Sequence, residues 1–174
     1  VNKPVIVSTA IGRGAKWSSQ QAENMKPGDY ILMTKQAGLE GTGIIAGDFR
    51  DELAGFLTDE EFQEAAEMLR QVSVVKEGVI AGKIGTAGMH DITEGGVLGA
   101  VWEMCDIAKT GAEVWIDRVP VAEVTKKICD RFDIDYLRLI SSGSMMIMVH
   151  PDVKEQMEKE LKTPTNKKLL LKKS

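Results

Sequence analysis

The sequence predicts a layered α/β or α+β domain in which helices cover a mixed sheet. Segments with the two-residue period of strands alternate along the chain with segments whose apolar residues follow the helical period. The composition, 43% hydrophobic and 28% charged residues, is typical of a folded soluble protein. No repeat or low-complexity linker divides the 174 residues, so we expect one domain with its own core.

The strand predictions depend on short apolar segments. Residues 30–34 are apolar on both faces and follow a Pro-Gly-Asp turn signal, which favours a central strand. Residues 145–149 form a second buried run, and apolar and polar residues alternate over 112–116. Residues 5–9 are apolar and β-branched and predict a strand or an extended lead-in, and residues 136–140 predict a short extended piece.

Helices are predicted where apolar residues recur every three or four positions. Thr58 and Glu61 form a capping box at the start of one of them. The predicted buried stripe of that helix is Phe62, Ala65, Ala66 and Leu69. The other helices are expected at 42–46, at 74–84, at 97–110, after Pro120 and after Pro151.

Charge and cysteine usage exclude several classes of function. The net charge of −4 argues against nucleic-acid binding, which usually uses a basic surface. Cys105 and Cys129 fall on apolar helix faces, which favours buried free thiols in a reducing compartment over a disulfide or a metal site. No segment reaches the roughly 18 apolar residues of a membrane span and no signal peptide opens the chain, so we expect a cytoplasmic protein without a membrane partner.

The densest group of polar and proton-active side chains lies directly before the helix expected at 97–110. The group and its glycines comprise His90, Asp91, Thr93, Glu94, Gly95 and Gly96. Thr93 is the predicted N-cap. Free amides at a helix start attract anions, and phosphate above all. The alternative interpretation is that the glycines only allow a tight approach to a buried helix.

A second glycine-rich stretch, residues 38–47, does not fit a nucleotide-binding fingerprint. The spacing of its glycines does not give Gly-x-Gly-x-x-Gly, and no Lys-Ser or Lys-Thr pair makes a P-loop. The small residues around Gly41 and Thr42 still permit a ligand to approach the backbone closely. Close packing between elements is the alternative role for them.

Four segments follow one another in a fixed order. They are Pro27-Gly28-Asp29 with its strand, the glycine turn at 38–43, His90-Asp-Ile-Thr-Glu-Gly-Gly96, and Ser141-Ser-Gly-Ser144 with the strand after it. In this order they resemble the C-terminal domain of the AIR-synthase-related superfamily, which includes aminoimidazole ribonucleotide synthetase, a hydrogenase-maturation dehydratase and thiamine-monophosphate kinase. The resemblance implies a layered α/β/α domain with partial ferredoxin-like topology.

The resemblance also implies that the chain is half of a two-domain enzyme. Residues 1–26 would be a linker and lead-in from an N-terminal domain, 27–162 the C-terminal domain, and 163–174 a solvated basic tail. In this family the N-terminal domain carries most of the acidic ligands for Mg²⁺ and ATP, and the C-terminal domain closes the cleft. A homo-oligomer, such as a dimer, is the expected assembly.

Site residues follow from the same resemblance. His90 is the candidate acid or base, and Asp91 is the candidate for holding a magnesium-bound water or for orienting His90, although Asp91 has the alternative role of capping its turn. The candidate phosphate-binding residues are Thr93, Glu94, Gly95, Gly96, Gly41, Thr42, Ser142 and Gly143. The expected substrate is a small phosphorylated or amide compound activated with ATP and Mg²⁺.

The branch of the superfamily stays open. The His90-Asp91 pair is closer to the formylglycinamidine branch, whereas the length and the Pro27 segment are nearer the hydrogenase-maturation branch. Two alternatives to a hydrogenase-maturation-like enzyme are therefore kept. One is a fragment of a purine-biosynthesis synthetase, and the other is a non-catalytic binding or interaction domain whose glycines serve packing.

Overall fold

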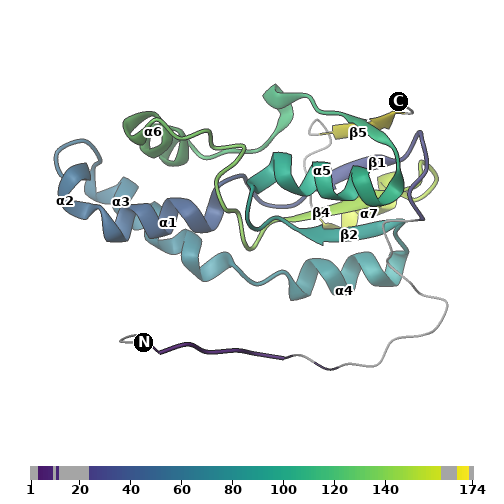
Figure 1. The fold of residues 1–174 in the computed structure, drawn as a ribbon, viewed down its shortest axis with the longest axis horizontal. Helices are drawn as coiled ribbons and strands as arrows, with labels where there is room; N and C mark the ends of the chain where they lie inside the picture. The colour runs from purple at the N-terminus through teal and green to yellow at the C-terminus, as the bar shows by residue number, and fades with distance from the viewer. Residues whose placement is uncertain (1–3, 10, 12–23, 162–167, 173–174) are drawn as a thin grey trace.

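A computed structural model of the chain describes residues 4–9, 11 and 24–161, and the backbone of residues 168–172. Within this part, helices alternate with short strands that make one sheet (Figure 1). The strands are β1 (Tyr30–Met33), β2 (Gly88–Asp91), β3 (Gly111–Glu113), β4 (Met145–Val149) and β5 (Lys168–Lys172). The α-helices are α1 (Leu39–Asp48), α2 (Arg50–Leu53), α3 (Asp59–Met68), α4 (Val75–Ile84), α5 (Gly96–Ala108), α6 (Glu123–Phe132) and α7 (Lys154–Leu161).

The strand order in the sheet is β2-β4-β1-β5-β3. The central position of β1 is confirmed, and Ile31 and Leu32 on its two faces are completely buried. All four strand pairings are antiparallel, so the sheet differs from the mixed sheet that we predicted. The alternation of helical and strand periods reports the order of elements but carries no information on strand direction, which explains the difference.

Helices cover both faces of this sheet (Figure 1). Successive residues of β4 point to opposite faces, so Met146 contacts one layer and Ile147 the other. Val97 of α5 belongs to the apolar cluster that contains Met146. Ala81 of α4 and Met157 of α7 belong to the cluster on the Ile147 side. The layered arrangement of helices and sheet is therefore confirmed.

A third apolar cluster lies among α1, α2, α3 and α6, the helices that extend beyond the sheet (Figure 1). Leu39, Leu53 and Ile128 are completely buried there. This cluster packs α1 against α3 and α6, and it thereby holds the glycine-rich stretch at the start of α1 in place. Among the described residues, no helix has both the length and the apolar content needed to cross a bilayer.

The prediction of a solvated basic tail over 163–174 is wrong for residues 168–172. These residues form β5, which pairs with β1 on one side and β3 on the other. Residues 162–167 and 173–174 lie outside the described residues. The lysines that flank three leucines indicated a surface segment, but a strand inserted between two neighbours satisfies its backbone on both sides regardless of the flanking charges.

Four further local expectations also need correction. Residues 88–91 form the strand β2, which the sequence pattern does not predict. The N-cap of α5 is Gly95, with φ 82°, and not Thr93, whose carbonyl oxygen accepts a hydrogen bond from the Gly96 amide. Helix α1 begins at Leu39 rather than at residue 42, and residues 136–140 form a turn rather than an extended piece.

The N-terminus of α3 has the capping box that the sequence predicts. The Glu61 amide donates to Thr58 Oγ1 at 3.2 Å, and the Thr58 amide donates to Glu61 Oε2 at 3.0 Å. A hydrogen bond from Lys127, and then the one from Thr58, hold the pKa of Glu61 below its usual value. The buried stripe is confirmed for Phe62 and Ala65, whereas Ala66 and Leu69 are exposed and Met68 is buried instead.

We expect Thr58→Ala to lower the free energy of unfolding by about 1 kcal/mol, because the first-turn amide of Glu61 then loses its acceptor. Urea unfolding followed by circular dichroism measures the change. Thr58→Ser keeps the hydroxyl and is the matched control, which we expect to behave like the wild type. Equal stability of the alanine variant and the wild type would contradict a working cap.

Candidate functional site

The three motifs singled out in the sequence meet at one end of the sheet. Backbone hydrogen bonds join the end of β2 to the turn before β4: the Ile92 amide donates to the Ser144 carbonyl oxygen, and the Ser141 amide donates to that of Ile92. The Gly38 amide donates to Ser141 Oγ at 2.6 Å, which ties the start of α1 to the same turn. The fold therefore brings residues 38–42, 90–96 and 141–144 together.

Four polar side chains of this junction reach the surface. The Asp91 carboxylate is 59% exposed at the end of β2, and Glu94 is exposed. Thr93 and Ser142 are half-buried. Carboxylates and hydroxyls in this position can bind a hydrated cation or accept and donate hydrogen bonds to a polar ligand. These four residues, with the exposed Gly95 backbone, form the candidate site.

His90 lies beside this site, but both of its ring nitrogens have partners within the protein. Nε2 is 2.8 Å from Glu103 Oε2 on α5, and Nδ1 contacts the Asp91 carbonyl oxygen. The Asp91 carboxylate is 4.0 Å from Nδ1, so Glu103 and not Asp91 orients the ring. The prediction that His90 is a catalytic acid or base does not fit this arrangement, because neither nitrogen is free to face a substrate.

Gly96 is buried for a packing reason. A Cβ at this position would lie 2.6 Å from the Leu137 carbonyl oxygen and 2.8 Å from that of Leu139. The Gly96 amide donates to the Thr93 carbonyl oxygen, and the Leu98 amide donates to that of Leu137. Two amides at the start of α5 are therefore occupied by protein carbonyls, and the prediction that Gly96 offers its amide to phosphate does not fit this structure.

Packing also explains the other buried residues predicted to bind phosphate. A Cβ at Gly41 would lie 2.5 Å from Leu139 Cγ, and one at Gly143 would lie 2.6 Å from the Gln71 carbonyl oxygen. Thr42 is completely buried, and its hydroxyl donates to Thr125 Oγ1 at 2.8 Å. These three positions hold elements close together and have no surface for a ligand, so we correct their predicted role to packing.

A magnesium–nucleotide complex fits the described residues only in part. They contain no group of three or more His, Cys, Asp and Glu side chains placed to hold a metal ion. Magnesium is usually bound through one or two carboxylates together with substrate phosphates, so Asp91 fits as one such ligand. Two cavities of about 130 Å³ in the described part of the chain lie elsewhere, because neither is lined by Asp91, Thr93, Glu94 or Ser142.

The two cysteines have no place in the candidate site. Both are free; Cys129 is buried and Cys105 is half-buried. Burial raises the pKa of both thiols, to about 11 for Cys129, where Asp130 and Asp135 add to the shift. The thiolate is the nucleophilic form of cysteine, so neither side chain is activated for covalent chemistry.

Sequence reasoning missed two charged residues that shape this end of the sheet. Glu103 reaches His90 from the second half of α5. Lys35, directly after β1, contacts backbone carbonyls of two separate loops and adopts the left-handed conformation with φ 51°. A positive φ at a lysine is uncommon, but only coordinates reveal it, and contacts across elements leave no periodic signal in the chain.

Comparisons with known proteins show the family and the fold of this domain. Residues 26–166 match the model of the family described as AIR synthase related protein, C-terminal domain. A putative hydrogenase expression/formation protein of Methanocaldococcus jannaschii is 25% identical over 156 residues, which are 87% of this chain and 43% of that protein. The chain thus spans less than half the length of this relative.

Solved structures show the same fold. Escherichia coli HypE, a hydrogenase maturation protein, matches with a TM-score of 0.69 and 22% identity, covering 90% of this chain and 48% of that one. Thiamine-monophosphate kinase from Stenotrophomonas maltophilia matches with a TM-score of 0.70 and 13% identity, covering 92% and 52%. A HypE in complex with ATP matches with a TM-score of 0.64 and 18% identity, covering 88% and 45%. Because the family model covers most of the residues, the chain belongs to the AIR synthase related family, whose C-terminal domain it carries.

Proposed function

We propose that this chain supplies one wall of an ATP site in a two-domain enzyme of the hydrogenase-maturation type. The observation that supports this most directly is the convergence of three motifs at one end of the sheet. There Asp91, Glu94 and the backbone of Gly95 are exposed, while Gly96 is buried. A site built from two carboxylates, two hydroxyls and a short exposed backbone can contact phosphates and a metal ion, but it is too open to enclose them.

The proposal assigns the second wall to another domain of the same protein. The matched relatives are about twice as long as this chain. Residues 5–7 are β-branched, extended and 78–86% exposed, and they lie apart from the sheet (Figure 1). An exposed extended apolar segment is suited to add a strand to a sheet elsewhere. In this proposal residues 4–9 pair with the N-terminal domain.

Asp91 is the residue that we place nearest the chemistry. Its carboxylate would bind one water or one coordination position of the Mg²⁺ that accompanies ATP, and Mg²⁺ would neutralise phosphate charge during transfer. Thr93 and Ser142 would donate hydrogen bonds to the phosphates or to a small phosphorylated or amide substrate. His90 serves to hold the end of β2 against α5 through Glu103.

Calorimetry with and without the second domain tests the shared site. We expect ATP with MgCl₂ to bind the two-domain protein and not residues 1–174 alone, and the functional assembly to be a homo-oligomer. Binding to neither form would favour the alternative of a non-catalytic interaction domain, which the buried Gly41, Gly96 and Gly143 would suit. Equal binding to both forms would show that the site needs no second wall.

Replacing Asp91 with Asn is expected to weaken Mg-ATP binding by the two-domain protein about tenfold or more, because the carboxylate charge is lost from the metal side. Asp106→Asn is the matched control, since Asp106 is 60% exposed on α5 and pairs only with Lys109 among the ion pairs found. Both variants should retain wild-type stability within about 0.5 kcal/mol. Unchanged affinity in the Asp91 variant would remove Asp91 from the site.

A further inference from the structure

Lys35 is held by more oxygen atoms than a surface lysine usually contacts. Its Nζ donates to the carbonyl oxygens of Gln71 at 2.8 Å, Ser73 at 2.7 Å and Gly143 at 2.7 Å. Glu77 Oε1 lies 3.3 Å away from the same nitrogen. An ammonium has three N–H donors, so the three carbonyls use all of them and the carboxylate supplies the countercharge.

Three carbonyl oxygens that converge on one point repel one another unless a cation lies between them. The Gln71 and Ser73 carbonyls belong to the segment before α4, and the Gly143 carbonyl belongs to the turn before β4. The two segments are in direct contact, because a Cβ at Gly143 would lie 2.6 Å from the Gln71 carbonyl oxygen. The positive charge of Lys35 therefore holds together two loops whose carbonyl oxygens would otherwise repel one another.

The ligand set and its dimensions match those of a monovalent cation site. Backbone carbonyls are the ligands that replace the hydration shell of potassium in selective protein sites. Magnesium and calcium need oxygens at about 2.0–2.1 Å and about 2.3–2.6 Å, closer than the carbonyls found around Lys35. Potassium and ammonium are similar to each other in size. The lysine head group is itself a substituted ammonium, so either ion could take its place among the same oxygens.

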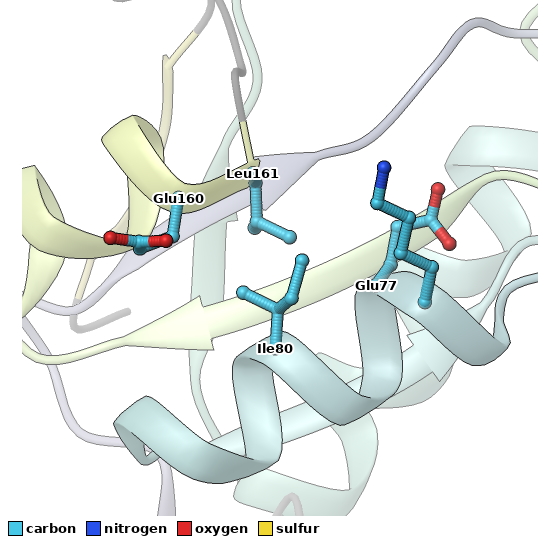
Figure 2. Close-up of a pocket in the computed structure, with 5 residues that line it drawn as sticks. Glu77, Ile80, Glu160 and Leu161 are labelled. Carbon is cyan, nitrogen blue, oxygen red and sulfur yellow. The ribbon is translucent and has the colours of Figure 1, made fainter.

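The cluster also has an unused ligand, and one of its residues lines a cavity. Glu77 Oε2 is buried and has no hydrogen-bond partner among the described residues. Glu77 lines one of the 130 Å³ cavities, between α4 and α7. Figure 2 shows Ile80 and Leu161 facing each other across that cavity, with the Glu77 and Glu160 carboxylates on opposite sides.

We propose that the cluster formed by the Gln71, Ser73 and Gly143 carbonyls and the Glu77 carboxylate is a monovalent-cation site that the chain fills with its own lysine. Lys35 acts as a tethered cation that sets the position of the turn carrying Ser142. Without the lysine head group, the same oxygens bind potassium or ammonium from solution. This inference does not depend on ATP binding, and its test is independent of nucleotide.

The test is the thermal unfolding of Lys35→Ala in the full chain, in the chlorides of sodium, potassium, ammonium and choline at about 0.15 M. In sodium or choline chloride we expect the melting temperature to fall by about 5 °C or more relative to the wild type. Potassium and ammonium should restore a large part of this loss, because a ligand that binds only the folded state stabilises it. The wild type should melt at the same temperature in all four salts.

Controls separate ion binding from a general loss of structure. Lys126→Ala removes a lysine that bonds Glu123 at the surface, and it should show no difference among the salts. Adding Glu77→Gln to Lys35→Ala should raise the potassium concentration at half-recovery about tenfold or more, because the countercharge is lost. If Lys35→Ala is already unfolded in sodium chloride at room temperature, its circular dichroism spectrum is compared in the four salts. Ammonium or potassium chloride should then restore the folded spectrum. A variant that responds equally to all four salts, or remains unfolded in all of them, overturns the proposal.

Discussion

Replacing Leu170 with proline is expected to lower the free energy of unfolding by about 2–4 kcal/mol. Leu170 is in register with Tyr30 of β1 and with Glu113 of β3, so its backbone lies between two strands. Proline has no N–H to donate and is rarely tolerated inside a sheet. The change removes one ladder hydrogen bond and leaves the carbonyl that accepts it without its donor.

Chemical unfolding of Leu170→Pro and Leu170→Val measures this effect. Valine keeps the backbone N–H and favours strands, so we expect that variant to stay within about 1 kcal/mol of the wild type. Hydrogen exchange of the 169–171 amides provides an independent reading, since paired amides exchange only on opening. If these amides exchange freely and Leu170→Pro has the same free energy of unfolding as the wild type, residues 168–172 are a solvated tail and the assignment of β5 is wrong.

The elements predicted well are those with a strong local signal. Met145–Val149 is a continuous apolar run, and such runs are typical of strands buried on both faces. Thr58 and Glu61 mark the start of α3 by two reciprocal hydrogen bonds, which depend only on the three-residue spacing between them. β5 was missed because three leucines flanked by lysines carry too little apolar length to indicate a central strand.

The candidate site was only partly predictable for a different reason. The proximity of residues 90–96 and 141–144 comes from pairing of β2 with β4, which are separated by α5, β3 and α6. The partner of His90 is Glu103 on a separate element, so no motif contains both residues. Glycines likewise have the same appearance in a sequence whether they accommodate a ligand or a neighbouring backbone. The coordinates distinguish these roles by what a Cβ would meet.

Replacing Gly96 with alanine is expected to lower the free energy of unfolding by about 3 kcal/mol or more, in the absence of any nucleotide. Gly96 has φ 61°, a region that costs roughly 1–2 kcal/mol for an L-residue. Its new Cβ would also press on backbone atoms of residues 137–139, which cannot move aside as a flexible side chain does. Thermal and urea unfolding of the variant measure the loss.

Gly82→Ala is the matched control, because Gly82 is exposed on α4 and a Cβ there meets nothing within 4 Å. In a helix this change should raise stability by about 0.5–1 kcal/mol. If Gly96→Ala were as stable as the wild type but lost Mg-ATP binding in the two-domain protein, Gly96 would belong to the anion site after all. If the variant is destabilised without any ligand, the role of Gly96 is to let α5 pack closely against residues 137–139. The candidate ligand-binding residues are then Asp91, Thr93, Glu94 and Ser142.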